Sequence, residues 1–197
     1  MTKKIHLFRH GITDWNLAKK MQGHSDISLN AEGRRQASDL QTYFANNPVD
    51  LFFSSDLVRA VETAQLANAK LNCPINIHSG LREANLGELE GLSIDEAHRY
   101  FGKEAWETWS SMDPQTFDFA FPRGESSNQV IKRLTETIQS LCENTEFTSA
   151  GLCTHGFAMR RFLHSLNPDL KSALPIPNCV VYTINWDIQK KYFNFSI

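Results

Sequence analysis

The stretch Lys3–Asn16, KKIHLFRHGITDWN, decides how this chain folds. Its first six residues are largely apolar and rich in β-favouring side chains, which is typical of a strand that enters a core. Arg9, His10 and Gly11 follow at once, so the strand ends in a polar turn. Glycine at such a turn lets the backbone bend sharply and lets a ligand approach closely.

Strand and helix patterns alternate outward from this stretch. Further strands are predicted over 49–55, 75–78, 149–155, 179–186 and 191–197. Helices are predicted over 31–46, 56–71 and 126–143, with Asn30 and Asp56 placed to cap the first two. Nearly continuous apolar strands between helices predict an α/β fold, a three-layer α/β/α sandwich with a mostly parallel central sheet.

One segment, about 84–125, breaks the alternation and is rich in aromatic residues. We interpret it as a mostly helical lid insertion within a single domain that spans 1–197. The aromatic residues are Tyr100, Phe101, Trp106, Trp109, Phe117, Phe119 and Phe121.

Composition narrows the class of protein. The 197 residues are 41% hydrophobic and 21% charged, which excludes a disordered, collagen-like or coiled-coil chain. A net charge of -2 and the lack of a basic stripe predict no nucleic-acid partner. We expect no membrane association and a cytoplasmic protein, because no secretory signal or long apolar segment is apparent. The four cysteines form no CxxC pair and are expected to be buried thiols.

Two predicted strand ends each carry a histidine. His10 follows the first strand beside Arg9, and His155 follows the strand at 149–155 and precedes Gly156. Small anions bind where strands of a parallel sheet lead into helices. Taken alone, either histidine is more often part of an ordinary polar turn than of a site, because such short motifs have many false positives.

Charged residues near two other turns add to this pattern. Arg59 lies in the first turn of a predicted helix, where the helix dipole favours anions, so a bound anion would explain it. The alternative is a surface arginine paired with Glu62. In LREANLGELEGL (81–92), one of Glu83, Glu88 and Glu90 could donate a proton to a leaving oxygen, and spacing does not choose among them.

Taken together, the motifs resemble the histidine phosphatase superfamily, which includes cofactor-dependent phosphoglycerate mutases and many phosphomonoesterases. The resemblance covers nearly the whole chain and keeps the family's order. It is carried by RHGITDWN (9–16), QGHSDISLNAEGRRQA (22–37), SSDLVRAVETA (54–64), LREANLGELEG (81–91), PRGES (122–126) and THG (154–156).

The resemblance implies a role for each matching residue. His10 matches the histidine that becomes phosphorylated, and Glu83 matches the acid that protonates the leaving oxygen. The residues implied to hold the phosphoryl group or close over it are Arg9, Asn16, Gln22, Gly23, Arg59, His155 and Gly156. No metal and no cofactor is expected, because arginines and helix-start amides supply the charge that phosphoryl transfer needs.

Within the family, the sequence favours hydrolysis over isomerisation. Leu86 and Ile94 stand where the mutases have a tyrosine and a lysine, the insertion lacks an adjacent arginine pair, and Thr13 is typical of phosphatases. We therefore expect a metal-independent phosphomonoesterase that hydrolyses a small-molecule phosphate ester and releases inorganic phosphate. The alternatives are a phosphoglycerate mutase-type isomerase and a non-catalytic module that binds phosphorylated ligands.

Finer expectations concern the insertion, the residues that follow the THG motif and the end of the chain. The aromatic residues either pack against one another, which base rates favour, or form an apolar lid for bulky leaving groups. Phe157, in place of a common glycine, predicts a narrower pocket wall. Arg160 matches a family arginine, whereas Arg161 is expected on the solvent side. The strand over 191–197 either pairs two copies in a homodimer or is covered.

Overall fold

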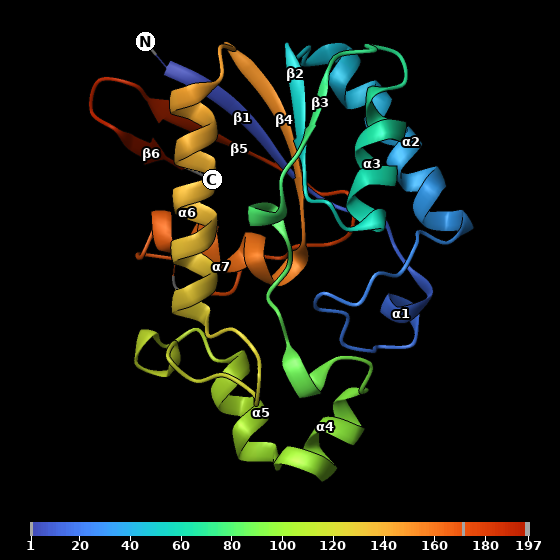
Figure 1. Cartoon of the computed structure of the whole chain (residues 1–197), viewed down its shortest axis with the longest axis vertical. Helices are drawn as coiled ribbons and strands as arrows, with labels where there is room; N and C mark the ends of the chain where they lie inside the picture. Colours follow the sequence, from blue (N-terminus) through green and yellow to red (C-terminus); the bar gives the residue numbers. More distant parts are fainter. Residues whose placement is uncertain (1, 171, 196–197) are drawn as a thin grey trace.

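A computed structural model describes residues 2–170 and 172–195. Within them, a single sheet has the strand order β3-β2-β4-β1-β5-β6 (Figure 1). The strands are β1 (Thr2–Arg9), β2 (Leu51–Ser54), β3 (Ile75–Ile77), β4 (Ser149–Thr154), β5 (Val181–Asp187) and β6 (Tyr192–Asn194). The first four are parallel to one another, β5 pairs antiparallel with β1, and β6 pairs antiparallel with β5. The predicted α/β fold with a mostly parallel sheet is therefore confirmed.

Four helices cover the two faces of this sheet (Figure 1). They are α2 (Ala31–Asn46), α3 (Val58–Asn68), α6 (Ser127–Asn144) and α7 (Gly156–Leu166). Side chains alternate along β1, so Ile5 and Leu7 pack with α6 and α7, whereas Phe8 packs with α2 and α3. This alternation divides the core into two clusters and explains the three layers.

The insertion lies beyond the carboxyl ends of the parallel strands (Figure 1). It contains α4 (Ile94–Phe101), α5 (Lys103–Ser110) and short 3₁₀ helices at Gly87–Leu89 and Pro114–Thr116. Another 3₁₀ turn, Ser79–Leu81, precedes it, and α1 (Asp14–Leu17) follows the first strand. The helical character predicted for this segment is thus present.

The two ends of the insertion meet at one clamp. The Glu125 N–H donates to the Asn85 carbonyl at 2.7 Å, and the Asn85 N–H donates to Glu125 Oε2 at 2.8 Å. Arg133 on α6 donates to both Glu125 oxygens at 2.8 Å, and also to the Glu83 carbonyl at 3.1 Å. The insertion therefore leaves and re-enters the sandwich at the same point, next to Glu83.

Two predicted boundaries are wrong for a physical reason. Helix α3 begins after Leu57 rather than at Asp56, and ends at Asn68 rather than Leu71. Asp56 does not cap it, because both its carboxylate oxygens accept hydrogen bonds from Arg82, at 2.7 and 2.6 Å. A bidentate arginine–carboxylate pair is stronger than a single capping bond. The last strand is also shorter than predicted, and residues 196–197 lie outside the described residues.

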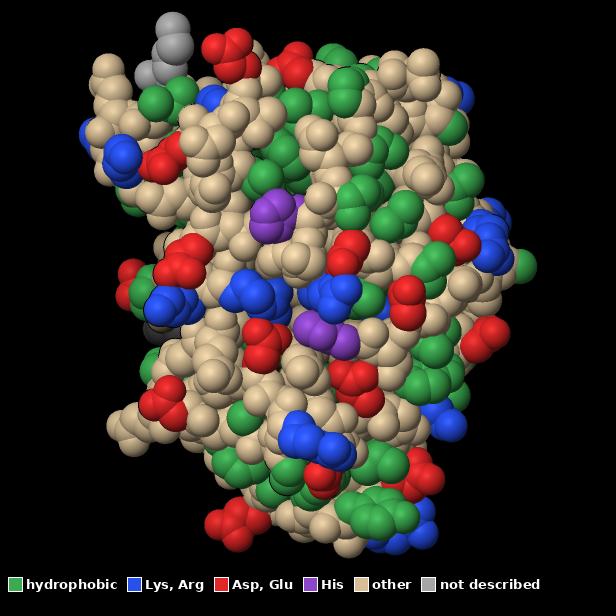
Figure 2. Space-filling model, viewed as in Figure 1, with side chains coloured by type: hydrophobic (Ala, Val, Ile, Leu, Met, Phe, Trp, Pro, Cys, Tyr) green, Lys and Arg blue, Asp and Glu red, His purple; other side chains and the backbone are tan. Residues whose placement is uncertain are grey.

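The surface matches the near-neutral composition on the face drawn in Figure 2, where acidic and basic side chains are interspersed. Among the described helices, none combines the length and the apolar character needed to cross a bilayer.

Two glycines hold the turn after β1 against α2. A Cβ atom on Gly33 would lie 2.0 Å from the Ile12 carbonyl oxygen, and one on Gly11 would lie 2.5 Å from the Gly33 oxygen. Both obstacles are backbone atoms, which cannot rotate away. The glycine of the AEGRRQA motif therefore allows the helix to approach the turn that carries His10.

Gly33→Ala is expected to lower the free energy of unfolding by about 1–3 kcal/mol, the scale of overpacking. Alanine usually stabilises a helix interior by about 0.5–1 kcal/mol over glycine, so the expected sign is reversed here. Chemical denaturation measures the change. Ser38→Ala in the same helix is the control and should stay within about 0.5 kcal/mol. A Gly33→Ala protein as stable as the parent would contradict the close approach.

Candidate active site

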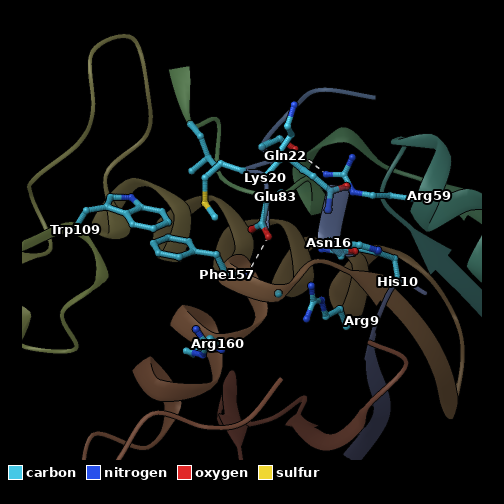
Figure 3. Close-up of a pocket in the computed structure, with 14 residues that line it drawn as sticks. Arg9, His10, Asn16, Lys20, Gln22, Arg59, Glu83, Trp109, Phe157 and Arg160 are labelled. Carbon is cyan, nitrogen blue, oxygen red and sulfur yellow. Dashed lines mark hydrogen bonds between the residues drawn. The ribbon is translucent and has the colours of Figure 1, made fainter. Parts of the chain in front are cut away.

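His10 presents one ring nitrogen to a pocket at the carboxyl end of β1 (Figure 3). The side chain is buried, and its Nδ1 lies 2.7 Å from the Gly11 carbonyl oxygen. A carbonyl oxygen only accepts, so Nδ1 carries the proton and Nε2 keeps its lone pair. Burial lowers the pKa of His10 well below 6.5, and the charges of Arg59 and Arg9 lower it further. The ring is therefore neutral and suited to nucleophilic attack.

We predict that His10 stays neutral at about pH 6, where an imidazole with an ordinary pKa would be largely charged. Because the pKa is lowered, the neutral form persists as the pH falls, and protonation begins only below that pH. Long-range nitrogen–proton NMR of the ring should show the Nδ1-protonated tautomer at pH 6, with free imidazole in the same tube as the reference. A ring that titrates together with free imidazole would contradict the prediction.

His155 lies behind His10 at the end of β4. Its ring centroid is 5.1 Å from that of His10, and the side chain is fully buried. Burial lowers the pKa of His155 well below 6.5, with further contributions from Arg59, His10 and Arg9. Neither ring nitrogen has a hydrogen-bond partner among the described residues. Buried polar atoms are normally satisfied by hydrogen bonds, and these two nitrogens are an exception to that rule.

Two arginines line the same pocket, Arg59 buried and Arg9 half-buried. Arg59 on α3 has no exposed surface, and its Nη atoms donate to the carbonyls of Ser25 at 2.8 Å and Gly23 at 2.7 Å. Arg9 donates to the Ile176 carbonyl at 2.6 Å. Burial lowers the pKa of Arg59 to about 10, so the group stays charged at neutral pH.

These two cations have no carboxylate partner in an ion pair within 2–170 and 172–195. The alternative pairing of Arg59 with Glu62 is wrong, because Glu62 bonds to Arg34 and to the Leu29 N–H. Buried charge is costly unless it is compensated, so the pair is arranged for an anion.

Glu83 also lines the pocket and lies at the N-terminus of α7. Its Oε1 accepts from the N–H groups of Ala84 at 3.0 Å and Ala158 at 2.7 Å, and its Oε2 accepts from Phe157 N–H at 3.0 Å. Glu88, by contrast, is at the surface and pairs with Arg123. Of the three glutamates left open by spacing, Glu83 is the one that faces His10 across the pocket (Figure 3).

The pocket has a volume of about 180 Å³ and gathers eight of the nine predicted site residues. They are Arg9, His10, Asn16, Gln22, Gly23, Arg59, Glu83 and Gly156. The ninth, His155, packs against His10 as described. The side chain of Asn16 is fixed by Thr13, whose N–H and hydroxyl both donate to Asn16 Oδ1, so the amide NH₂ remains a donor.

Sequence reasoning did not recognise the role of Glu90. Its carboxylate accepts hydrogen bonds from the N–H groups of His24 and Ser25, both at 2.8 Å, from the Ser25 hydroxyl at 2.7 Å and from Leu86 N–H at 3.2 Å. These bonds fix the loop whose carbonyls hold Arg59. Gly23 was the sequence feature that could have pointed to this close contact, because a Cβ atom on residue 23 would lie 2.2 Å from Glu90 Oε1.

Glu90→Gln is expected to raise KM for a phosphate ester about tenfold with a smaller effect on kcat. The amide NH₂ cannot accept from the loop N–H groups, and losing charge-assisted hydrogen bonds costs about 1.5–3 kcal/mol, which loosens Arg59. Steady-state kinetics measures both constants. Glu88→Gln, two residues away in an exposed ion pair, is the control and should stay within about twofold. Equal effects of the two substitutions would rule out this positioning role.

The far wall of the pocket is aromatic. Trp109 and Phe157 stack with their ring centroids 4.6 Å apart and an interplanar angle of 3° (Figure 3). Trp109 also packs on Trp106 and Phe121. Most insertion aromatics therefore pack against one another, as base rates favoured, but Trp109 also borders the pocket.

Arg161 does not face solvent, contrary to the sequence-based expectation. It is 1% exposed, and its guanidinium carbon lies 4.7 Å from the Phe157 ring centre and 4.6 Å from that of Phe117. It also donates to the Trp109 carbonyl at 2.9 Å. Residues four apart share a helix face, so Arg161 lies on the same face of α7 as Phe157 and packs, as Phe157 does, against the insertion.

Comparison with known proteins agrees with this geometry. The family model described as "Histidine phosphatase superfamily (branch 1)" matches residues 5–195. Phosphoglycerate mutase-like protein 4 of Arabidopsis thaliana is 33% identical over 181 residues, which cover 90% of this chain and 77% of that protein.

Two solved structures are similar over nearly their whole lengths. YhfR of Bacillus stearothermophilus superposes with a TM-score of 0.88 at 27% identity, covering 99% of this chain and 96% of that one. A phosphoserine phosphatase of Entamoeba histolytica, in complex with 3-phosphoglyceric acid, gives a TM-score of 0.76 at 25% identity, covering 99% and 95%. Because the family model matches residues 5–195, this chain belongs to branch 1 of the histidine phosphatase superfamily.

Proposed function

We propose that the protein is a metal-independent phosphomonoesterase that works through a phosphohistidine on His10. One observation carries this proposal: a neutral imidazole with a free Nε2 faces a pocket lined by buried Arg59 and half-buried Arg9, and neither arginine forms an ion pair with a carboxylate of the described residues. Phosphoryl transfer asks a protein mainly to position the reactants and to stabilise charge on the equatorial oxygens. The charges of Arg9 and Arg59 match those of a dianionic phosphate ester.

In the first step, His10 Nε2 attacks phosphorus while the bond to the ester oxygen breaks. The departing oxygen takes a proton from Glu83, which leaves a neutral alcohol or phenol. In the free protein, the two carboxyl oxygens of Glu83 accept hydrogen bonds from three N–H groups. Under this proposal, the Asn16 amide and His155 donate hydrogen bonds to the phosphoryl oxygens.

In the second step, water attacks the phosphorus of phospho-His10. Glu83, now ionised, takes a proton from the water, and the P–N bond breaks. The products are inorganic phosphate and neutral His10, so the cycle needs no metal and no redox partner. The same group acts as acid and then as base, as microscopic reversibility allows.

Apolar side chains in the pocket support hydrolysis over mutase activity. Leu86, Trp109 and Phe157 line it beside Lys20 and Arg160, and apolar side chains do not hold a second phosphoryl group. A mutase has to reorient a doubly charged phosphoglycerate without losing it to water. The mutase-like name of the Arabidopsis relative keeps isomerisation as the second candidate.

Trapping the phosphoenzyme tests the proposal. The protein is mixed with a radiolabelled aryl phosphate, quenched in alkali and mapped by mass spectrometry. The expected result is label on His10 that is stable to alkali and lost in acid. In a parallel coupled assay, phosphate release should outpace the interconversion of phosphoglycerates. Turnover without label on His10 would overturn the mechanism, and faster interconversion would favour the mutase.

A further inference from the structure

His24 connects the loop that holds Arg59 to Glu83. The carbonyls of its two neighbours, Gly23 and Ser25, accept hydrogen bonds from the Arg59 guanidinium. The side chain of His24 reaches Glu83 instead, with its ring Nε2 at 2.9 Å from the Glu83 carbonyl oxygen. A carbonyl oxygen only accepts, so Nε2 carries the proton and donates. A single residue therefore joins the support of the buried arginine to the carboxylic acid of the pocket.

The main chain that carries this imidazole is itself fixed. The His24 N–H donates to Glu90 Oε1 at 2.8 Å, and the Ser25 N–H donates to Glu90 Oε2 at 2.8 Å. The ring is half-buried. From the other side, Arg133 on α6 donates to the same Glu83 carbonyl at 3.1 Å. The Glu83 main chain is thus held between α6 and the loop of Arg59.

The side chain of Glu83 is held at its far end by α7. Its two carboxyl oxygens accept from the N–H groups of Phe157 at 3.0 Å and Ala158 at 2.7 Å. N–H groups in the first turn of a helix have no partner within the helix, and the side chain at the N-cap, His155, does not bond to them. The contact with Glu83 therefore depends on where the Glu83 main chain lies, and a shift of that main chain disturbs it.

We propose that His24 is a positioning residue that fixes the proton donor Glu83 relative to Arg59 and to the phosphoryl group that Arg59 binds. This inference rests on the proposed function. Arg59 and Glu83 both line the pocket but come from segments 24 residues apart, so contacts between segments set their separation (Figure 3). Arg133 holds Glu83 to α6, whereas His24 holds it to the loop behind Arg59. Because small misplacements of a reacting group are costly, loss of this bond should affect proton transfer more than phosphate binding.

Two esters with different leaving groups test the proposal. 4-Nitrophenyl phosphate needs little help from a proton, whereas 2-phenylethyl phosphate depends on it. In His24→Ala, kcat/KM for the phenylethyl ester should fall about three- to tenfold, the range that one hydrogen bond contributes, and that for the nitrophenyl ester less than about twofold. His24→Gln should restore the lost activity, because its amide N–H can reach the position of Nε2.

Ser25→Ala is the matched control in the same loop. It removes a hydroxyl that donates to Glu90 at 2.7 Å and leaves the bond from His24 to Glu83 in place. Any loosening of the Arg59 support should therefore affect both esters alike. A selective loss in His24→Ala that His24→Gln restores would support the proposal.

Three results would overturn it. Equal losses for both esters in His24→Ala would mean that His24 only stabilises the loop. No loss for either ester would mean that Glu83 does not depend on His24. A selective loss that His24→Gln leaves uncorrected would assign the effect to the volume of the ring rather than to its hydrogen bond.

Hydrogen exchange decides the matter if the parent protein turns over neither ester, a result that would refute the proposed function alone. The N–H groups of Phe157 and Ala158 report on Glu83, because its carboxylate is their acceptor. Their exchange should be about three- to tenfold faster in His24→Ala than in the parent or in His24→Gln. The N–H of Phe162, in the interior of α7, is the internal reference. Unchanged exchange at Phe157 and Ala158 in His24→Ala would reject the positioning role.

Discussion

His10→Ala is expected to lower kcat for aryl phosphate hydrolysis by about 1,000-fold or more, the scale that follows the loss of a nucleophile. Alanine has no nitrogen to form the P–N bond, and no other described side chain combines a free lone pair with this position in the pocket. Phosphate release from 4-nitrophenyl phosphate measures the change. His78→Ala is the matched control, because this exposed histidine only caps the 3₁₀ turn at Ser79–Leu81.

Binding should survive the same substitution. Arg9 and Arg59 are held by carbonyls of Ile176, Gly23 and Ser25 rather than by His10, so the anion site keeps its charge. Inorganic phosphate should bind His10→Ala within about tenfold of the parent by calorimetry, since the charge-assisted bonds remain. Unchanged turnover in His10→Ala would remove the imidazole from the mechanism.

Glu83→Gln is the second large effect that we expect. For an alkyl phosphate, kcat should fall by about 100- to 10,000-fold, the usual contribution of a general acid. For 4-nitrophenyl phosphate the loss should be about tenfold or less, because its leaving oxygen needs little help from a proton. The ratio of the two losses is the decisive measurement. Equal losses for both esters would show that Glu83 does not protonate the leaving group.

A structural contribution of Glu83 has to be separated from this effect. Its carboxylate accepts from the first turn of α7, and glutamine can offer only one oxygen to those N–H groups. The loss of such a capping contact costs about 0.5–2 kcal/mol, which thermal unfolding detects. Since instability would act on both esters alike, it cannot produce a difference between them.

Much of the fold was accessible from local sequence. Helix α2 was predicted with its bounds and its Asn30 cap, because its apolar positions recur at helical spacing and its cap is a local hydrogen bond to Gly33. The pocket was accessible as well, because the strand ends that carry His10 and His155 are neighbours in a parallel sheet. That the turns carrying His10 and His155 lie at the same edge of the sheet can be predicted from the order of strands and helices.

What the sequence did not reveal depends on contacts between distant segments. Asp56 was expected to cap a helix and instead binds Arg82, which lies 26 residues further along the chain. Arg161 was expected at the surface and is buried under an insertion that begins more than 70 positions earlier. Glu90 stabilises a loop at residues 24–25. In each case the partner of the charged side chain lies far away in the sequence and is determined by the tertiary fold.

The clamp at Asn85, Glu125 and Arg133 has a consequence for engineering and for how this fold diversifies. Because both ends of the insertion meet at this clamp, its outer helices α4 and α5 can be exchanged while Glu90 and the residues around His10 keep their positions. Under the proposed function, selectivity for an ester and the ability to cleave it are then carried by separate segments of the chain.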